Sequence, residues 1–536
     1  MNQDLVLIHV SIIAGYTFLS HAIILIDDGL HWDGWILDSW QRTRNWAVMR
    51  RVYAEVGLSP FYYLHKALSN VPARIFVYRF IAFSATLASS IAVYFLGVQT
   101  GILNELQSLL LALLYLSYTG YHMNADTVVG VHYTLATAIF YWAVCLTFLS
   151  VDYTGSAHWI LRVISLVLFL SAFNANSTLV YYFGFLGLKS FLSWNPAGDV
   201  VSNAFRELIE NLDYLVLPFA YWFLKNALMP RHGHYENYNR IQVRLPNLAM
   251  KLLDAIRFGI EASITMPIRS AIAHHYLWVP VLAFALTFWI SFNDSAGAPL
   301  ISPVAAAGMV GLGSVFVILA ALPYALVGQN FFPGGWTTKH HMLFHLPVSL
   351  IVLGAVGWTF PAHVMLPAIA FMLTNNAIYL NLTYLHHIGA AVKNRSWLYK
   401  LSKIEGARDI SVFLVTDLHS IRGDPFVPEQ EHRPAYLFYM FEWLWGDKNH
   451  CGIPVDEAFH ERLPADQVSR ALVESTLDYD MGQVNVLGPQ ARVVISDGPL
   501  RPSSMIPLFY LRRRWLRAGK VEGVLEAATE LKYTPL

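Results

Sequence analysis

Two adjacent acids stand where a long apolar run stops. The run covers residues 5–26 and ends directly at Asp27-Asp28. About 22 apolar residues are enough to cross the hydrocarbon core of a membrane, so both acids are expected where a spanning helix leaves the lipid. A partly desolvated carboxylate has a raised pKa and is a competent general base. One acid at such a place can be a topological stop, but two acids followed by Gly29 favour a functional role for at least one of them.

Further polar residues are candidates for binding an acceptor or a sugar. Trp32 and Asp33 follow in the same loop. Trp-rich loops fit sugar stacking, although they fit anchoring at the membrane interface better. Asp126 lies in a short link that is expected on the same membrane side as Asp27, and it could bind an acceptor or a metal. The alternative for Asp126 is a capping role before a helix that begins near Val128.

A cationic turn precedes the tenth apolar run. Residues 329–345 read QNFFPGGWTTKHHMLFH, where Pro-Gly-Gly forces a turn and Lys339 and His340 stand at the entrance of a helix. Cations and hydrogen-bond donors near a helix N-terminus suit a phosphate. Arg231 and His232 open a second long loop and add two further donors. Counting apolar runs places both segments on the side of Asp27, so one membrane face is expected to gather acids and phosphate-binding bases.

Composition indicates a membrane protein with many spans. The chain has 536 residues, of which 55% are hydrophobic and 13% charged, and a soluble chain would carry roughly twice that charge fraction. The formal net charge is zero, so no bulk field favours nucleic acid as a partner. The N-terminus has no basic region and no small-residue cleavage site after residue 26, so we expect a retained helix rather than a signal peptide. Two distant cysteines do not predict a disulfide framework.

Apolar runs of spanning length recur, and we expect an α-helical polytopic protein with about eleven transmembrane helices. The runs lie near 5–26, 75–98, 101–118, 130–150, 158–174, 177–193, 212–229, 276–293, 300–328, 343–360 and 363–385. Two long amphipathic loops, 27–74 and 230–275, are predicted to form helices at the interface, the first broken at Ser59-Pro60.

The character of the chain changes near residue 389. The tail is charged and rich in proline, with short β-like runs at Ile410–Val415 and Val493–Ile495. We therefore predict a transmembrane domain over 1–388 and a small soluble α+β domain over 389–536. The tail holds a basic and aromatic segment, Leu508–Lys520, which could rest on anionic headgroups or form an exposed helix face.

The layout resembles the GT-C superfamily of membrane glycosyltransferases, in particular bacterial members related to the dolichyl-phosphate-mannose and lipid-linked arabinose transferases. Local matches are Asp27-Asp28 after the first span, Ser171–Tyr181, and Leu322–Leu346. Relatives commonly carry Arg-His where this chain has Lys339-His340. Lysine keeps the charge but loses the bidentate fork of arginine.

The resemblance implies a specific reaction. A sugar would pass from a polyprenyl-phosphate donor, taken from the membrane lipids, to a glycan, lipid or protein acceptor with inversion at the anomeric carbon. Asp28 or Asp27 would be the catalytic base. Lys339, His340, Arg231 and His232 would hold the donor phosphate, and Asp33, Asp126 and Trp32 would bind the acceptor or the sugar. Some relatives use a divalent metal such as Mg or Mn and others use none, so no cofactor is certain.

The resemblance places the chain in a bacterial inner membrane with its active site outside the cytoplasm. The charge pattern of the first loop opposes this orientation, because basic residues favour the cytoplasmic side. We follow the resemblance, since a site for phosphate needs cations on its own face. The basic residues of that loop are Arg42, Arg44, Arg50, Arg51 and Lys66.

Three other functions stay open. A His-rich membrane di-iron oxygenase would use some of the 21 histidines, which include pairs at His274-His275, His340-His341 and His386-His387. Expected further histidine boxes are missing. A polytopic transporter or flippase of a lipid or polar solute would use the same many-span body but predicts charges within the spans or broken helices. A non-catalytic partner in an envelope assembly is the third alternative.

Overall fold

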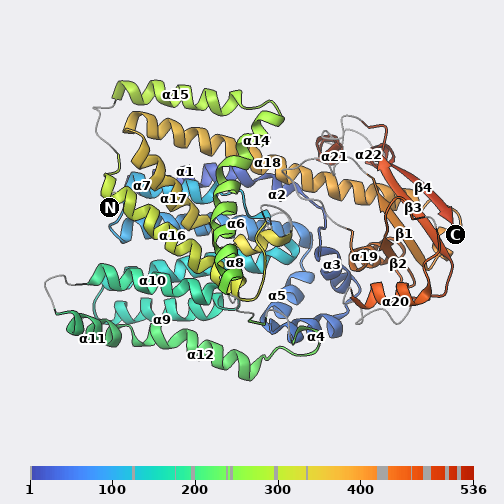
Figure 1. Ribbon diagram of the computed structural model, residues 1–536, viewed down its shortest axis with the longest axis horizontal. Coiled ribbons are helices and arrows are strands. Elements are labelled where there is room, and N and C mark those ends of the chain that lie inside the picture. The colour runs from blue at the N-terminus through green and yellow to red at the C-terminus, as the bar shows by residue number, and fades with distance from the viewer. Residues whose placement is uncertain are drawn as a thin grey trace.

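The computed structural model is mostly helical and ends in a small sheet domain (Figure 1). Among the described residues, six helices are long and apolar enough to cross a membrane, or seven if a bent helix pair counts as one span. These helices suggest a membrane protein. The structure describes residues 3–122, 127–175, 177–194, 199–236, 240–241, 245–294, 300–332, 336–418, 432–459, 461–474, 484–500, 506–515 and 521–536.

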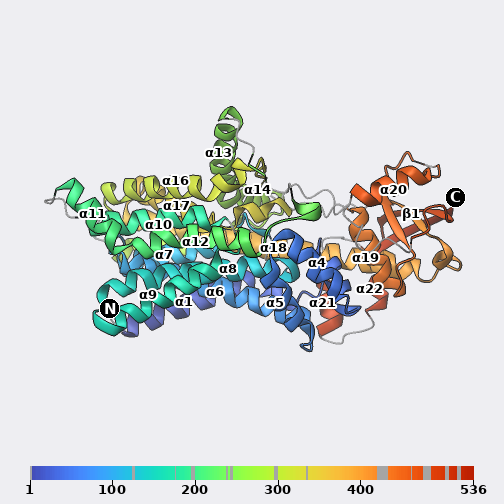
Figure 2. The same ribbon diagram turned by 90° about the horizontal axis from the view of Figure 1, so that it is seen from below.

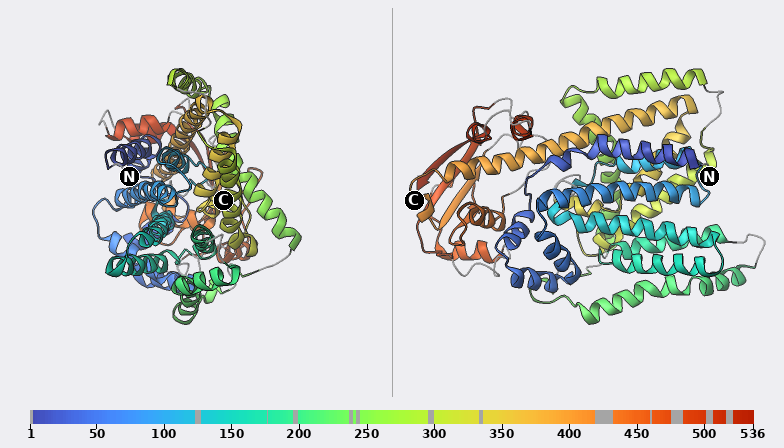
Figure 3. Two further views of the ribbon diagram at one scale, coloured as in Figure 1. Left: turned by 90° about the vertical axis from the view of Figure 1, so that its left-hand side faces the viewer. Right: turned by 180° about the vertical axis from the view of Figure 1, so that it is seen from behind.

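The apolar helices form a bundle whose long members run side by side (Figures 1 and 3). Helix α6 packs on α8, α16 on α17, and α15 on α18. The helices up to α9 are α1 (Gln3–His21), α2 (Ile23–Ile26), α3 (Gly34–Arg42), α4 (Trp46–Val56), α5 (Ser59–Ser69), α6 (Arg74–Gln99), α7 (Glu105–Leu116), α8 (Thr127–Leu149) and α9 (Gly155–Ala172). Those that follow are α10 (Thr178–Ser193), α11 (Val200–Glu210), α12 (Leu212–Leu228), α13 (Leu245–Ile260), α14 (Met266–Ala273), α15 (Trp278–Asp294), α16 (Pro303–Leu326), α17 (His345–Thr359) and α18 (Ala362–Leu401).

Each of the eleven apolar runs coincides with a helix, but the count of about eleven spans is not confirmed. Helices α7, α10, α12 and α17 have 12, 16, 17 and 15 residues, and about 20 are needed to cross a bilayer. The runs are longer than the helices because apolar loop residues extend them. Leu343 and Phe344, for example, precede α17.

The first loop folds into three helices at one end of the bundle. Asn45 caps α4 by accepting from the backbone N–H of Val48 at 3.4 Å, and Gly57 ends that helix in the left-handed conformation with φ 75°. Helix α5 begins at Ser59-Pro60, where the sequence predicted a break. Helix α3 packs on α8 and also on α19 (Pro434–Trp445) of the C-terminal domain.

The second loop is partly helical as well. A π-helical turn, Glu261–Thr265, joins α13 to α14. Residues 246–273 and 278–292 together pass as one apolar span, but they are bent by 117°.

The C-terminal domain contains a four-stranded sheet with the order β2-β1-β3-β4. Strand β1 is parallel to β2 and β3, and β3 is antiparallel to β4. Both predicted β-runs coincide with strands, so the tail contains a small sheet beside its helices. The domain comprises β1 (Val412–Asp417), α19 (Pro434–Trp445), β2 (Cys451–Pro454), α20 (Ala465–Glu474), β3 (Gln490–Asp497), α21 (Ile506–Trp515), α22 (Glu522–Ala528) and β4 (Thr529–Pro535).

Helix α18 connects the bundle to the sheet domain (Figure 2). It has 40 residues, and the predicted domain boundary between 388 and 389 lies inside it. Its last turns pack on α21, α22 and β4. Lys393 of α18 forms a buried ion pair with Asp417 at the end of β1, with 2.5 Å between Nζ and Oδ2. The two parts of the chain are therefore joined by a continuous helix and by a buried charge pair.

Candidate functional site

The acid loop, residues 27–33, connects α2 to α3 and is bound to the bundle through Asp27. The Asp27 carboxylate accepts from the backbone N–H of Gly29 at 2.7 Å and lies 3.2 Å from Nε2 of His31. Nη2 of Arg79, in α6, lies 2.9 Å from Asp27 Oδ2 and donates to the carbonyl of Gly29 at 2.8 Å. Arg79 and Asp27 are 0% and 5% exposed. This arrangement fixes the conformation of the loop.

These partners change the acidity of Asp27. Burial raises its pKa, but the Arg79 guanidinium and His31 outweigh burial and bring the pKa down to about 2. The sequence predicted a raised pKa for an acid at this place, and that prediction is wrong for Asp27. A general base works best when its pKa is near the working pH. Asp27 is therefore suited to positioning the loop rather than to accepting a proton.

Asp28 contacts the C-terminal part of the chain. Its carboxylate lies 2.5 Å from Nη1 of Arg395 in α18 and also forms an ion pair with Arg514 of α21. The Tyr510 hydroxyl donates to it at 3.2 Å, and Arg395 donates to the Asp28 carbonyl at 2.7 Å. Two guanidinium groups thus occupy the carboxylate that the sequence nominated first as catalytic base.

Asp33 has a different environment, because it faces the cationic turn. Burial raises the pKa of Asp33, and the Lys339 ammonium, a hydrogen bond from Tyr436 and the charge of Arg433 lower it in part. Burial likewise lowers the pKa of Lys339, and Asp33 opposes that change. The acid of this loop that interacts electrostatically with Lys339 is therefore Asp33, whereas the contacts of Asp27 and Asp28 described above are with other elements.

The cationic turn is a short 3-10 helix, η5 (Trp336–His341), fixed by its neighbours. Thr338 accepts from the backbone N–H of His122 at 3.1 Å. His340 contacts the Asn330 carbonyl at 3.1 Å through Nδ1, and its ring centroid lies 4.6 Å from that of Tyr324. Burial and the Lys339 charge lower the pKa of His340 to about 4. His340 is therefore neutral at pH 7, and Lys339 is the cation that this turn brings to the site.

Arg231 and His232 lie at the same end of the bundle. The backbone N–H of His232 donates to the carbonyl of Glu55 in α4 at 3.2 Å, which joins the second loop to the first. Arg231 and Lys225 line a cavity of about 590 Å³ between α10, α12 and α16, and Tyr324 is part of its wall. Tyr324 also contacts His340, so one wall residue of this cavity touches the cationic turn. The side chain of His232 is exposed.

Trp32 adopts an unusual backbone conformation. Its φ of 41° is rare for a non-glycine residue and costs on the order of 1 kcal/mol or more. The side chain is 4% exposed, and its ring centroid lies 5.4 Å from that of His387. In this structure the ring packs against other side chains and presents no open face for a sugar. Asp126 lies outside the described residues.

Sequence reasoning missed several residues near Asp33 and Lys339. His132, in α8, is 4% exposed and interacts electrostatically with Lys339, and no hydrogen-bond partner for either ring nitrogen is present among the described residues. His65, in α5, lies beside it with 6.3 Å between ring centroids. Burial lowers the pKa of His65 to about 3. Arg433 and Tyr436, at the start of α19, also interact with Asp33. A lone histidine in an apolar helix gives no sequence signal for such a role.

Two acids of the loop are poorly suited to a divalent metal. Within the described ranges, no group of three or more His, Cys, Asp or Glu side chains is placed to hold a metal ion. Asp27 and Asp28 lie against guanidinium groups, which repel a dication. These two acids therefore do not fit Mg or Mn, and Asp126 lies outside the described residues.

The candidate site thus lies between the acid loop, the cationic turn and the first residues of α19. It combines a carboxylate of raised pKa, an ammonium group and buried imidazoles, and it lies at the end of the bundle that also carries the C-terminal domain (Figure 1). No family model matches the chain, and comparison with curated proteins and with solved structures finds no match.

Proposed function

We propose that this chain is an inverting membrane glycosyltransferase of the GT-C type, which moves a sugar from a polyprenyl-phosphate donor to a glycan, lipid or protein acceptor. The observation that carries the proposal is the electrostatic interaction between Asp33 of the acid loop and Lys339 of the cationic turn. Proton removal from an acceptor and charge stabilisation on a leaving phosphate need such a pair. The resemblance to the GT-C superfamily further implies that the site faces the outside of a bacterial inner membrane.

In the proposed reaction Asp33 takes the proton of the acceptor hydroxyl. The acceptor oxygen forms a bond to the anomeric carbon as the bond from that carbon to the phosphate oxygen breaks. One displacement inverts the configuration, and the electron pair leaves with the polyprenyl phosphate. Lys339 stabilises the negative charge of that phosphate. Arg433 is a second cation, whose charge acts on both Asp33 and Lys339.

Asp27 and Asp28 have supporting roles in this proposal. Asp27 fixes the loop against Arg79, and Asp28 binds Arg395 and Arg514. Both act through the position of Asp33, so they are positioning residues here. This assignment differs from the one that the resemblance implies, in which Asp28 or Asp27 is the base.

The test is turnover of labelled polyprenyl-phosphate sugars by the purified chain in lipid vesicles. Asp33→Asn should lower kcat by about 10²- to 10⁴-fold with little change in KM, since general-base catalysis contributes about that much. Asp38→Asn is the matched control, because Asp38 lies in the neighbouring helix and pairs with Arg74. If Asp33→Asn turns over normally while Asp27→Asn or Asp28→Asn is inactive, Asp33 is not the catalytic base, and the inactive variant identifies the acid that is. The absence of sugar transfer from every such donor would refute the proposal.

A transporter or flippase is the second candidate, and one observation favours it. The apolar helices over residues 246–273 and 278–292 are bent by 117° at the short break between them, and broken helices are common at transport sites. In vesicles, a flippase would move a labelled lipid across the bilayer without transferring its sugar. A glycosyltransferase with Asp33→Asn should still bind the lipid donor but lose the product.

A further inference from the structure

A second polar cavity lies at the end of the bundle that is remote from the C-terminal domain. It has a volume of about 980 Å³, and its walls come from α9, α10 and α12 together with the ends of α6 and α8. Helix α11 lies at this end, and the sheet domain lies at the other (Figures 1 and 2). The charged residues of its lining are Asp152, Arg162, Lys189, Glu210 and Asp213. None of them belongs to the candidate glycosyl-transfer site.

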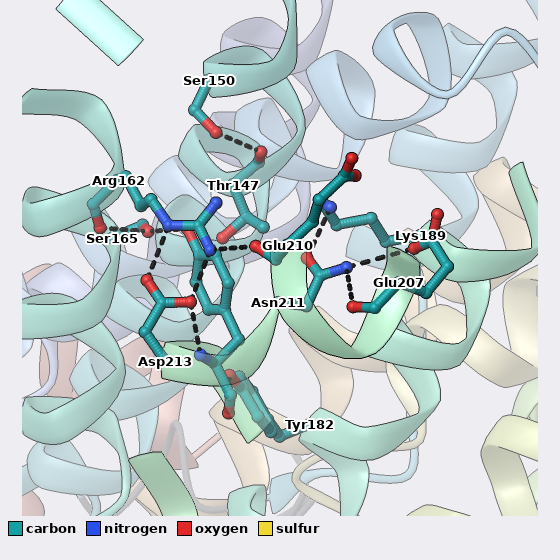
Figure 4. Close-up of polar contacts among 11 residues, drawn as sticks. Thr147, Ser150, Arg162, Ser165, Tyr182, Lys189, Glu207, Glu210, Asn211 and Asp213 are labelled. Carbon is teal, nitrogen blue, oxygen red and sulfur yellow. Dashed lines mark hydrogen bonds and ion pairs between the residues drawn. The ribbon is translucent and has the colours of Figure 1, made fainter. Parts of the chain in front are cut away.

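The Arg162–Asp213 pair forms a rigid part of this wall (Figure 4). Nε of Arg162 donates to Asp213 Oδ2 at 2.6 Å, and Nη2 donates to Oδ1 at 2.5 Å. The guanidinium carbon also lies 4.7 Å from the centre of the Tyr214 ring. Arg162 is 8% exposed. The hydrogen bonds of the Arg162 guanidinium to Asp213 fix α9 to α12. Because this guanidinium already has its acceptors, we expect other residues of the cavity to bind a ligand.

Lys189 is the cation that remains available. Its ammonium donates to Asn211 Oδ1 at 2.6 Å, and no second acceptor for it is found among the described residues (Figure 4). An ammonium group has three donors, so two are left for a ligand. Asp152 and Glu210 line the same cavity, and within the described ranges neither carboxylate has an ion-pair partner. The cavity therefore offers a donor for a phosphate and acceptors for an ammonium group.

An apolar cavity adjoins the polar one. It has a volume of about 640 Å³ between α6, α7, α10 and α16, and its lining is almost entirely aliphatic and aromatic. Thr100 and Leu192 belong to the walls of both cavities. The outer rim of the polar cavity exposes large apolar side chains, with Trp159 and Leu212 at 62% and 54% exposure. A ligand that fills both spaces must be amphipathic.

We propose that the two cavities together bind a phospholipid with a primary-amine headgroup, of the phosphatidylethanolamine class. Lys189 binds its phosphate, Asp152 and Glu210 bind its ammonium group, and one acyl chain enters the apolar cavity. The lining carries three carboxylates and two cations, so a zwitterion is favoured over an anionic lipid. The site lies at the membrane face opposite the candidate glycosyl-transfer site and does not depend on the proposed function.

The test is native mass spectrometry of the full-length protein, delipidated in detergent and incubated separately with phosphatidylethanolamine, phosphatidylcholine and phosphatidylglycerol. Phosphatidylethanolamine should bind about tenfold more tightly than the other two. Lys189→Gln should lower its affinity about tenfold, since a hydrogen bond to a charged group contributes about 1.5–3 kcal/mol. Lys403→Gln is the control, because Lys403 pairs with the exposed Glu526 of the C-terminal domain, lies outside the cavity lining and should leave binding unchanged.

A second variant tests the apolar cavity without altering a charge. Gly187 lines it, and a Cβ at this position meets no atom within 4 Å, so Gly187→Leu can fill the space without disturbing the backbone. This variant should lose the bound phospholipid while keeping its thermal stability. Equal binding of the three lipids would overturn the proposal, as would tighter binding of phosphatidylglycerol. Unchanged phosphatidylethanolamine binding by both Lys189→Gln and Gly187→Leu would overturn it too.

Discussion

The ion pair between Arg79 and Asp27 gives the sharpest test of how the acid loop is held. Arg79 is fully buried in α6, and its Nη2 contacts both the Asp27 carboxylate at 2.9 Å and the Gly29 carbonyl at 2.8 Å. Arg79→Met keeps the length and packing of the side chain but removes its charge. Asp27 would then remain buried with His31 and one backbone N–H as partners. We expect the loop to lose its fixed conformation.

The size of the effect follows from the burial of the pair. Removing one member of a buried ion pair typically costs about 3–5 kcal/mol, because the other charge is left uncompensated. For a chain of this size the Tm should fall by about 3–5 °C. Arg79→Met/Asp27→Asn leaves no unpaired charge and should recover about 2 kcal/mol or more of that loss. The double variant should therefore be more stable than Arg79→Met alone.

The two cysteines of the chain provide the assay. Cys145 is buried in α8 and Cys451 is buried in β2, so a thiol-reactive dye reports their exposure during heating. Cys451→Ser leaves Cys145 as a reporter of the bundle. Cys145→Ser leaves Cys451, whose pKa burial raises to about 12, as a reporter of the C-terminal domain. Arg79→Met should lower the unfolding temperature that Cys145 reports by more than the one that Cys451 reports.

Two results would refute this reasoning. A loss below about 1 kcal/mol for Arg79→Met would mean that the Asp27 charge does not need its partner. A double variant as unstable as the sum of the single variants would mean that the two side chains do not interact energetically.

Two further predictions concern charge at other positions and other pH values. The pKa of Asp27 falls from 3.8 to about 2 on folding. Its ionised form therefore contributes about 2 kcal/mol to the free energy of unfolding above pH 4, and this contribution is lost as the pH falls from about 4 to about 2. Unfolding followed by tryptophan fluorescence should show this loss, and the double variant Arg79→Met/Asp27→Asn should lack it. Burial raises the pKa of Asp417, but Lys393 and His432 outweigh it and hold the pKa well below its usual range. Lys393→Met should therefore destabilise the C-terminal domain by about 3 kcal/mol, seen as exposure of Cys451 at a lower temperature.

The sequence predicts the positions of the helices well and their ends poorly. Hydropathy over a window finds the long apolar helices of the bundle but not the apolar helix α19 of the C-terminal domain, and capping decides where a helix stops. Asn104 begins α7 through a reciprocal capping box with Gln107, although Ile102 and Leu103 extend the apolar run before it. A count of runs consequently includes helices that are shorter than a bilayer is thick.

The sequence predicts which segments form the candidate site, but it does not predict which acid of the loop takes part in it. Counting runs predicts the acid loop and the cationic turn on one membrane side, and the structure shows an electrostatic interaction between them through Asp33 and Lys339. The choice among Asp27, Asp28 and Asp33 depends on partners that lie far away in the sequence, such as Arg395 and Lys339. A carboxylate between guanidinium groups and a carboxylate that interacts with an ammonium group have the same sequence signature, so only the fold separates them.

The three acids of one loop bind to three different parts of the chain, and this arrangement links their positions. Asp27 contacts α6, Asp28 contacts α18 and α21, and Asp33 faces the cationic turn and α19. Only five residues lie between Asp27 and Asp33, so a shift of either of the first two acids moves the third. The C-terminal domain therefore takes part in the geometry of the candidate site, through Asp28 on one side and through Tyr436 on the other. A chain that lacked the domain would keep its apolar helices but lose partners of both Asp28 and Asp33.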